Sequence, residues 1–500
     1  MANPPNELTI DLINACKAHS GRVAIEGEGV TISYATLLAE AESLGQQLLD
    51  AGVGESTAVM VKCSNHPSDF VALLAVWITG AAAIPVHRTS PMDVLTGIQA
   101  KAQCLASIDL MAGSWPACFT AMDAVGQTTE ARKNLLRKAA LVIFTSGSTG
   151  LPKGAVLSHR AFHGKLHQNT RLFQPSVDTV SLLVLNNTFS FGIWVALMTL
   201  LNGGRVIAMS RFTPTGFLEA LVEKQVTFVG VVPTMIRATF GTLGTGDLDA
   251  ARASLAAAGT LRQVVIGGEP LGKQLSASLR AFIDPAVLFD VYGLTETSTS
   301  DFYLDPSDYP RYEASIGKPA PGITYRIVDA QGRECSPQIA GELQINSPFI
   351  MEGYLGDDEL TTAAFSEGWF RTGDLAAYDD KGYVTIVGRL KELIVRGGNK
   401  ITPLEVERAL MKCSGVGVAM VTGLPDPILG QRIHAFIVPK AGEAIDLNRI
   451  KEELAGFLEK FKCPDFYYLG DTQPTGRTGK IDRGQLARWI ESGNVHPVES

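Results

Sequence analysis

The chain has 500 residues, a formal net charge of −8, 46% hydrophobic residues and 19% charged residues. This length is too great for one hydrophobic core, so at least two domains are expected, and the composition is ordinary for a soluble globular protein. The acidic balance leaves no basic surplus to neutralise a phosphate backbone, which argues against a nucleic-acid-binding protein.

Cysteine content and hydropathy predict a cytoplasmic protein without a membrane span. The seven cysteines are odd in number and lack CxxC spacing, which favours a reduced setting over disulfides or a zinc site. The start, MANPPNELTIDL, lacks the basic residues and apolar core of a signal peptide. The most membrane-like stretch, residues 70–86, is broken by Gly80 and Pro85, so a buried helix followed by a strand is expected there.

The N-terminal two thirds of the chain predict alternating strands and helices. An amphipathic helix is expected over residues 7–19, followed by a hairpin and by a helix that Gly52 ends. The next expected elements cover residues 58–63, 70–78 and 81–86, and the alternation continues to about residue 330. This alternation of strands and helices indicates an α/β architecture with substantial parallel sheet, although no element is assigned between residues 102 and 140.

The C-terminal third has a different pattern of residues. Short alternating runs after residue 316, such as 325–328 and 342–345, indicate a β-rich subdomain. A separate, smaller unit of helices and strands follows. We therefore expect an α/β protein with an N-terminal domain over residues 1–388, made of α/β subdomains and a β-rich subdomain, and a small C-terminal α+β domain over residues 389–500.

The loop after the apolar strand at residues 139–144 has the composition of a phosphate-binding site. The stretch from Phe144 to Gly154 reads FTSGSTGLPKG, so glycines, hydroxyl side chains and Lys153 are concentrated in one turn. Backbone N–H groups, hydroxyls and a lysine together can hold a polyphosphate, whereas an ordinary exposed turn would also be rich in Gly and Ser. Phosphate binding is the favoured interpretation.

Two specific loop types are excluded. A Walker A loop has glycine directly before its lysine, but Pro152 precedes Lys153. A hydrolase nucleophile elbow would need glycine at position 146 to make Ser148 the nucleophile, and position 146 is serine. The loop is therefore predicted to cradle a ligand and not to supply a nucleophile.

Further segments carry polar groups at strand ends and in turns. VIGGEPL contains Gly267, Gly268 and Glu269, and VYGLTET contains a flat ring and a carboxylate, Glu296, of the type that Mg²⁺ binds. WFRTGDL places Asp374 in a tight turn, GRLKELIVRGGNKI carries four basic residues, and PTGRTGKIDR places Lys480 in a glycine-rich loop. Taken singly, each segment could be a surface turn, a solvated charge or a helix start.

All six segments, in this order and at these intervals, resemble the adenylate-forming superfamily of acyl-CoA synthetases, luciferases and peptide-synthetase adenylation domains. The resemblance covers essentially the whole chain, and its most specific parts are TSGSTGLPKG, YGLTET, RTGD, GRLKELI and GRTGK. The last loop departs from the commoner RTPTGK but keeps the lysine and adds Arg477. The resemblance implies that a carboxylate attacks the α-phosphate of ATP, releasing pyrophosphate, and that a thiol then attacks the acyl-AMP.

The resemblance also implies roles for individual residues. Lys480, Thr145 and Glu296 would be catalytic, with Lys480 contacting the carboxylate and the α-phosphate, and Glu296 and Thr145 holding Mg²⁺. Tyr292 would stack on adenine, and Asp374 and Arg389 would bind the ribose hydroxyls. The full set implied to bind the nucleotide is Thr145, Ser146, Gly147, Ser148, Thr149, Gly150, Lys153, Gly267, Gly268, Glu269, Asp290, Tyr292, Gly293, Thr295, Asp374, Arg389 and Lys480.

In this superfamily the small C-terminal domain rotates after adenylation, which makes it a mobile lid. Lys391 would be the hinge, and Arg396, Gly397 and Gly398 would border the thiol channel. The implied cofactors are ATP, Mg²⁺ and CoA, or the phosphopantetheine of a carrier protein. The oligomeric state is left open.

The acid-binding segment is expected over residues 186–194, NNTFSFGIW. Amino-acid-activating relatives have an aspartate where this chain has Ser190, so α-amino acids are not expected as substrates, and an apolar aliphatic or aromatic acid is favoured. Trp194 has even odds of being a core residue instead. The expected acyl-binding residues are Phe189, Ser190, Phe191, Gly192, Val231 and Gly268.

Three functions remain open at this point. The favoured one is a CoA ligase for a hydrophobic carboxylic acid. The first alternative uses the same adenylation step but loads the acid onto a carrier protein, and the second is a non-catalytic nucleotide-binding homologue. The presence of Lys480, Glu296 and Asp374 together argues against the second alternative.

Overall fold

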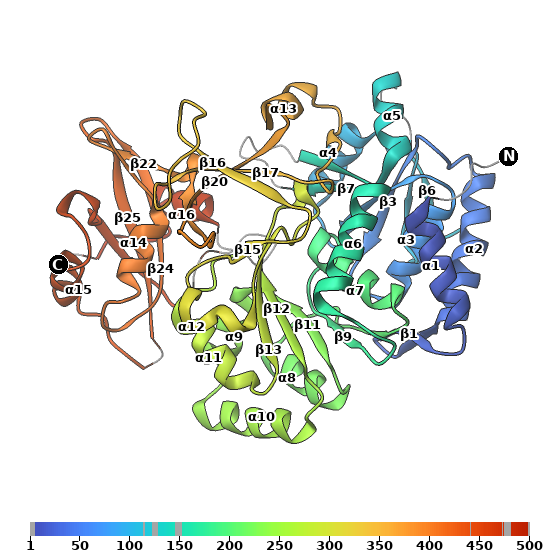
Figure 1. Cartoon of the computed structure of the whole chain (residues 1–500), viewed down its shortest axis with the longest axis horizontal. Helices are drawn as coiled ribbons and strands as arrows, with labels where there is room; N and C mark the ends of the chain where they lie inside the picture. The colour runs from blue at the N-terminus through green and yellow to red at the C-terminus, as the bar shows by residue number, and fades with distance from the viewer. Residues whose placement is uncertain are drawn as a thin grey trace. The chain divides into compact units, whose positions relative to one another are not determined.

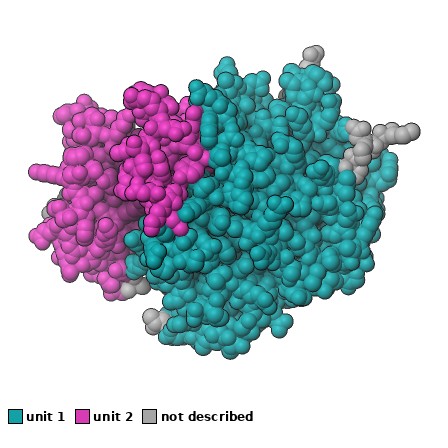
Figure 2. All heavy atoms as spheres, viewed as in Figure 1, with its two compact units in different colours: residues 1–324, 346–370 teal, residues 325–345, 371–500 magenta. Residues whose placement is uncertain are grey.

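The computed structural model describes residues 6–113, 116–122, 129–145, 153–440, 442–472, 474 and 482–498 (Figure 1). Contacts group the chain into two compact units, Met1–Thr324 with Asn346–Phe370 and Tyr325–Ile345 with Arg371–Ser500 (Figure 2). The second unit thus begins before the domain boundary expected at residues 388–389. That boundary stays a prediction, because it concerns the C-terminal domain that is expected to rotate. Among the described helices, none has the length and apolar character needed to cross a membrane.

The larger sheet of the first unit is the parallel sheet that the alternating sequence predicts. Its central strands are parallel, and antiparallel strands lie at both ends. In spatial order the strands are β15 (Lys318–Pro319), β14 (Phe302–Leu304), β13 (Val287–Tyr292), β12 (Gln263–Gly267), β11 (Phe228–Val231), β9 (Val180–Leu183), β10 (Arg205–Ala208), β1 (Val23–Gly27) and β2 (Val30–Ser33). The expected N-terminal hairpin, β1–β2, is confirmed and forms one edge of this sheet.

The second sheet of this unit carries the glycine-rich loop. In spatial order it contains β18 (Gly353–Tyr354), β8 (Lys153–Ser158), β7 (Ala139–Thr145), β4 (Ala82–His87), β3 (Ala58–Cys63), β5 (Ala106–Ile108) and β6 (Phe119–Ala121). Strands β7 and β8 form an antiparallel hairpin, with Thr145 paired to Lys153. The hairpin therefore places both ends of residues 146–152 at one corner of the sheet.

Helices pack on the faces of these two sheets. They are α1 (Glu7–Ala18), α2 (Tyr34–Asp50), α3 (Pro67–Ile78), α4 (Met92–Ala102), α5 (Glu130–Lys138), α6 (His159–Phe173), α7 (Ser190–Leu201), α8 (Pro214–Glu223), α9 (Pro233–Thr242), α10 (Thr245–Ala258), α11 (Lys273–Ile283), α12 (Tyr309–Tyr312) and α13 (Asp358–Ala363), with short 3₁₀ turns η1 (Thr295–Thr297) and η2 (Pro306–Asp308). Helix α6 contacts β7 and β8, helix α7 contacts β9, β10 and β11, and the two helices contact each other, so they lie between the sheets (Figure 1).

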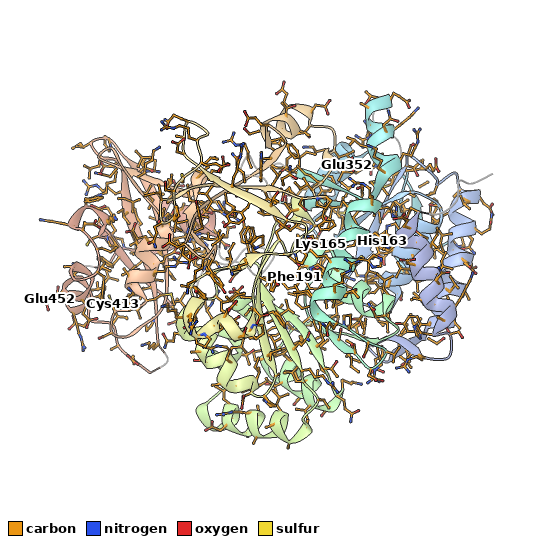
Figure 3. All side chains as sticks on the ribbon, viewed as in Figure 1. His163, Lys165, Phe191, Glu352, Cys413 and Glu452 are labelled. Carbon is orange, nitrogen blue, oxygen red and sulfur yellow. The ribbon has the colours of Figure 1, made fainter. Side chains whose placement is uncertain are left out.

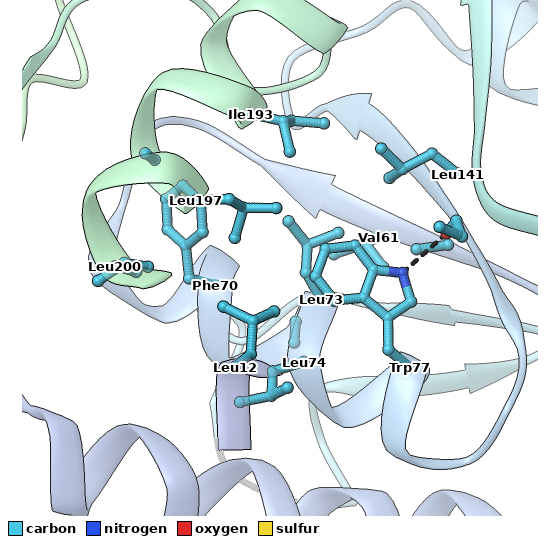
Figure 4. Packing of buried hydrophobic residues seen from close by; sticks show 14 of the residues in the cluster. Leu12, Val61, Phe70, Leu73, Leu74, Trp77, Leu141, Ile193, Leu197 and Leu200 are labelled. Atoms are coloured by element: carbon cyan, nitrogen blue, oxygen red, sulfur yellow. Dashed lines mark hydrogen bonds between the residues drawn. The ribbon is translucent and has the colours of Figure 1, made fainter. Parts of the chain in front are cut away.

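The apolar stretch at residues 70–86 forms part of the core, as expected. Residues 70–77 of α3 are all buried, and β4 follows directly. Trp77 lies in this core with its indole N–H donating to the carbonyl of Ala140 at 2.7 Å (Figure 4). Satisfying this one polar atom allows the large ring to be fully buried. The side chain of His66 and that of Asp69 form a capping box that starts the helix.

The second unit is β-rich and then mixed, as the sequence predicts. Its first sheet contains β16 (Thr324–Val328), β17 (Gly341–Asn346), β20 (Trp369–Tyr378) and β21 (Val384–Arg389), and β19 (Phe365–Ser366) pairs with the first residues of β20. The second sheet is ordered β23 (Asn399–Ile401), β22 (Ile394–Arg396), β25 (Gly430–Pro439) and β24 (Val416–Asp426), with β26 (Phe466–Leu469) beside β25. The helical elements are η3 (Leu390–Glu392), α14 (Pro403–Leu410), α15 (Leu447–Ala455), η4 (Lys460–Lys462) and α16 (Arg483–Glu491).

Candidate active site

The glycine-rich loop is anchored by the β7–β8 hairpin. Thr145 and Lys153 face each other in the register of the two strands. A side chain at Gly154 would lie 2.8 Å from the ring of Phe144, so only glycine fits there without a shift. The predicted phosphate-binding residues Ser146, Gly147, Ser148, Thr149 and Gly150 lie outside the described residues. The structure therefore places the two ends of the predicted cradle and not its middle.

Tyr354 lies between Glu296 and Lys153. Its hydroxyl donates a hydrogen bond to Oε1 of Glu296 at 2.8 Å, and Nζ of Lys153 lies 5.6 Å from the centre of its ring. The N–H of Met351 also donates to the carbonyl of Glu296 at 2.7 Å. Burial, with the nearby Glu296 carboxylate, raises the pKa of the Tyr354 hydroxyl, which thus stays a hydrogen-bond donor. Sequence analysis missed Tyr354, since it lies outside the glycine-rich and charged motifs.

The loop from Tyr292 to Asp301 folds tightly back on itself. The N–H of Asp301 donates to the carbonyl of Tyr292 at 2.7 Å, and a side chain at Gly293 would lie 2.3 Å from the nitrogen of Ser300. Residues 298, 299 and 300 all have left-handed backbones, with φ between 58° and 61°. Such a run of non-glycine residues is strained, so surrounding contacts must hold it.

A buried ion pair supplies part of that support. Lys165, on α6, donates to Oδ1 of Asp301 at 3.0 Å and to the carbonyl of Ser300 at 3.2 Å, and both side chains are fully buried. Thr297 donates to the other carboxylate oxygen of Asp301. Burial lowers the pKa of Lys165 and raises the pKa of Asp301, and the pairing of the two side chains opposes both shifts. Lys165 thus holds the segment that carries Thr295 and Glu296.

The carboxyl ends of β12 and β13 bring together the predicted adenine-side residues. Gly267 is required because a side chain there would lie 2.4 Å from the carbonyl of Val291, and Gly268 has a φ of 87°. Glu269 accepts hydrogen bonds from Thr234 at 2.8 and 2.9 Å and from Arg237 at 2.5 Å.

Asp290 lies on β13 and pairs in register with Ile266 of β12. Burial raises its pKa to about 8. Its carboxyl therefore carries a proton in much of the population near neutral pH, and it can donate as well as accept a hydrogen bond.

The expected acid-binding segment follows β9 and starts α7. Phe189 and Phe191 are partly buried and pack against the core, whereas Ser190 and Val231 have 1% and 0% exposure. A side chain at Gly192 would lie 2.6 Å from the carbonyl of Asn186. Trp194 is fully buried and stacks between Phe173 and Phe191, with ring centres 5.7 and 5.2 Å away. The structure thus places Trp194 in the core.

A buried polar network fixes the start of this segment. The Asn187 N–H donates to Oδ1 of Asn65 at 2.9 Å, and the Asn65 N–H donates to Oδ1 of Asn187 at 3.3 Å. The side-chain amide of Asn187 also donates to Asp69 at 2.9 Å. Sequence analysis missed this network, because its partners lie more than a hundred residues apart in the chain.

In the second unit, the predicted ribose-binding pair is in direct contact. Asp374 and Arg389 are opposite each other in the β20–β21 register, and Nε of Arg389 lies 2.7 Å from Oδ1 of Asp374. Asp374 is 2% exposed and its backbone N–H donates to Thr372. Gly373 provides the left-handed backbone, with φ 70°, that precedes it.

The predicted hinge and thiol-channel residues lie close together in sequence but differ in their surroundings. Lys391 is an exposed residue of η3, and Gly397 and Gly398 form the left-handed turn between β22 and β23. Arg396 is paired with Asp465 at 2.6 Å and donates to the carbonyl of Phe461 at 2.8 Å. Lys480 lies outside the described residues.

Arg483 anchors the helix that follows the Lys480 loop. It pairs with Glu407 at 2.6 Å and with Glu392, next to the predicted hinge, at 2.9 Å. Glu407 is 5% exposed, and burial raises its pKa while Arg483 opposes that shift. Sequence analysis did not single out Arg483.

Known proteins share these features across nearly the whole chain. Residues 12–355 match the AMP-binding enzyme family, and residues 405–480 match the AMP-binding enzyme C-terminal domain. A feruloyl-CoA synthase of Amycolatopsis sp is 32% identical over 93% of this chain and 95% of its own length. A fatty acid–[acyl-carrier-protein] ligase, ScoC, of Streptomyces coeruleorubidus is 29% identical over 93% of this chain and 92% of its own.

Solved structures share the fold. The o-succinylbenzoate CoA synthetase of Bacillus subtilis, in complex with its acyl-adenylate intermediate, superposes with a TM-score of 0.80. The match covers 97% of this chain and 98% of that chain at 22% identity. The mixed α/β architecture with a large N-terminal and a small C-terminal domain, expected from the sequence, is therefore confirmed. The chain belongs to the AMP-binding enzyme family of the adenylate-forming superfamily and is an AMP-forming acid–thiol ligase of the acyl-CoA synthetase type.

Proposed function

We propose that this ligase activates an apolar aliphatic or aromatic carboxylic acid and transfers it to CoA. A carboxylate oxygen attacks the α-phosphorus of ATP, the bond from that phosphorus to the bridging oxygen breaks, and pyrophosphate leaves. The thiolate of CoA then attacks the acyl carbon and AMP leaves. Both steps bring anions together, so positioning and positive charge supply most of the rate enhancement.

The apolar character of the acid-binding segment is the observation that carries the substrate class. Residues 186–194 contain no ionised side chain, and Ser190 stands where amino-acid-activating relatives carry an aspartate. Phe189 and Phe191 lie beside this serine and are partly buried. An ammonium group would find no counter-charge on this segment, whereas an alkyl chain or aromatic ring would pack against the phenyl rings. The likeness to a feruloyl-CoA synthase supports an aromatic acid.

The nucleotide is assigned to the residues that the family resemblance implies. Thr145, the glycine-rich loop and Lys153 would hold the β- and γ-phosphates, Tyr292 would stack on adenine, and Gly267, Gly268 and Asp290 would line its edges. In the second unit, Asp374 and Arg389 would bind the ribose hydroxyls, and their contact at 2.7 Å keeps both groups ordered for that task. Lys480 would contact the α-phosphate and the attacking carboxylate.

The residues assigned to Mg²⁺ fit that ion chemically. Glu296 and Thr145 supply hard oxygen ligands, and Mg²⁺ is usually held by one or two carboxylates together with substrate phosphates. When bound, the ion would neutralise phosphate charge. The hydrogen bond from Tyr354 to Oε1 orients the Glu296 carboxylate and leaves its other oxygen available.

An assay of the first half-reaction tests the proposal. ATP–pyrophosphate exchange is measured across a panel of fatty, aryl, dicarboxylic and amino acids, and exchange is expected with apolar acids and not with α-amino acids. Strong exchange with an α-amino acid would contradict the assignment of the acyl segment. Exchange with none of the acids, at any ATP concentration, would favour the non-catalytic alternative.

Transfer to a carrier protein is the second candidate function, and the likeness to a fatty acid–[acyl-carrier-protein] ligase favours it. Both functions share the adenylation step and differ only in the thiol. The acid identified by the exchange assay is therefore supplied with free CoA or with phosphopantetheine-loaded carrier proteins. Release of AMP when free CoA is the thiol supports the CoA ligase. Release only when a carrier protein is the thiol supports transfer to a carrier protein.

Replacing Tyr354 by phenylalanine is expected to weaken the response to Mg²⁺. The ring remains, but Glu296 loses a donor that orients it, and loss of such a partner typically weakens a metal site about 10–100-fold. The half-saturating Mg²⁺ concentration for pyrophosphate exchange should rise accordingly. Tyr378→Phe, which removes a hydroxyl bonded to the carbonyl of Cys335, is the matched control. An unchanged Mg²⁺ response in Tyr354→Phe would remove Tyr354 from the site.

Replacing Lys391 by proline is expected to separate the two half-reactions. Proline restricts backbone rotation at the proposed hinge, so closure for adenylation should survive while the later rotation is slowed. Single-turnover measurements should show acyl-AMP formation within a few-fold of wild type and thioester formation slowed by roughly tenfold or more. Lys391→Ala controls for the loss of charge. Equal slowing of both half-reactions by the proline variant would contradict a hinge at this residue.

A further inference from the structure

Two histidines and an aspartate converge where α1 packs against α6, away from the proposed active site. Nε2 of His163 lies 2.9 Å from Oδ2 of Asp11 and 2.9 Å from Nε2 of His167, and Nε2 of His167 lies 3.4 Å from the same carboxylate oxygen. His163 and His167 are one turn apart on α6, and Asp11 comes from α1. Figure 3 shows His163 on the α1 side of α6, with Lys165 on the other side.

We propose that Asp11, His163 and His167 bind a divalent transition-metal ion of the zinc class. Two imidazole nitrogens and one carboxylate oxygen are a ligand set that suits Zn²⁺, Co²⁺ and Ni²⁺, whereas Mg²⁺ prefers oxygen ligands. In a tetrahedral zinc site with ligand distances near 2.1 Å, neighbouring ligand atoms are about 3.4 Å apart. The three separations here, 2.9 to 3.4 Å, require shifts of a few tenths of an ångström to accept the ion.

A second carboxylate lies beside the other ring nitrogen of His163. Nδ1 of His163 lies 3.6 Å from a carboxylate oxygen of Glu7, which is one turn before Asp11 on α1. When Nε2 binds an ion, the proton of the ring is on Nδ1, where the Glu7 carboxylate can accept it and orient the ring. The His163 side chain is 11% exposed and that of His167 is 53% exposed, so the ion would have one open side facing solvent.

The bound ion would join two helices that are distant in sequence. It would fix α1 to the face of α6 that carries His163, and the opposite face of α6 carries Lys165 with its contacts to Ser300 and Asp301. The alternative is a cluster that only shares protons among its three polar atoms. The two differ in whether zinc binds at one site per chain and stabilises the fold.

Metal binding to the full chain, purified without a polyhistidine tag and treated with a chelator, tests the proposal. Cys463→Ser is used as the background, since Cys463 is the one cysteine that is not buried. One equivalent of Zn²⁺ should bind in calorimetry and raise the melting temperature, and Co²⁺ should give visible absorption bands of a nitrogen- and oxygen-ligated ion. His167→Ala and Asp11→Asn should each weaken Zn²⁺ binding by at least about tenfold.

His496→Ala is the control, because His496 is exposed and lies outside the cluster. It should bind Zn²⁺ as the background protein does. His167 is more than half exposed on its helix, so its replacement should leave the metal-free melting temperature unchanged. Equal Zn²⁺ affinity in the background protein and His167→Ala, or no binding by the background protein, would overturn the proposal.

Discussion

Lys480→Ala is expected to reduce the rate of acyl-AMP formation by roughly 10²–10³-fold, since a positioned donor to developing negative charge is worth about that much. The attacking carboxylate and the triphosphate are both anionic, and Lys480 is proposed to contact the two together. Its removal restores their repulsion at the moment the new bond forms. The measurement is single-turnover formation of acyl-AMP, or ATP–pyrophosphate exchange, with the best acid from the panel.

A neighbouring residue provides the matched control for this prediction. Arg477 lies in the same glycine-rich loop and carries the same charge, so Arg477→Ala makes an equal change in local charge. Its effect should stay within a few-fold of wild type, since no contact to the reacting groups is proposed for Arg477. The thioester-forming step, started from supplied acyl-AMP, should be nearly normal in Lys480→Ala. Acyl-AMP formation at the wild-type rate in that variant would remove Lys480 from the reaction.

Local patterns in the sequence were sufficient to predict much of the fold. Alternating apolar runs separated by glycines indicated the parallel sheets, and Gly80 correctly separated a buried helix from the strand that contains Pro85. In the smaller unit, helix α15 ends at Ala455, directly before Gly456. The described elements between residues 102 and 140 are short strands and one amphipathic helix, which give little periodicity to detect.

The groups that orient the site were harder to predict, because their partners come from distant parts of the chain. Tyr354 is 58 residues from Glu296, and Asn65 is 122 residues from Asn187. No spacing rule within one element relates such residues, so only the tertiary structure brings them together. By contrast, Asp374 and Arg389 lie on adjacent strands of a hairpin, and their pairing is set by local register.

Lys165→Met is expected to destabilise the first unit by about 3–5 kcal/mol, because it leaves the carboxylate of Asp301 buried without its counter-charge. Methionine has a similar length, so the change removes the charge while largely filling the same space. The loss should appear as a lower melting temperature and a lower denaturant midpoint. The matched control is Lys138→Met, which breaks an exposed ion pair with Glu352 and should cost less than about 1 kcal/mol.

The double variant Lys165→Met/Asp301→Asn distinguishes an unpaired charge from lost packing. If the unpaired carboxylate dominates, neutralising it should recover a large part of the stability lost in Lys165→Met. If the loss comes from packing against Phe349, whose ring centre lies 4.8 Å from Nζ, the double variant should be no more stable than the single one.

The same pair of variants tests whether Lys165 positions the nucleotide site. Lys165 contacts the end of a strained loop whose beginning carries Tyr292 and Glu296, so its loss should let residues 298–300 leave their left-handed conformations. The KM for ATP should then rise in Lys165→Met at a temperature where the protein is still folded, and it should stay near wild type in Lys138→Met. The double variant also lacks Lys165 but has no unpaired charge. A raised KM that persists there would show that positioning of the loop depends on the lysine itself, separately from global stability.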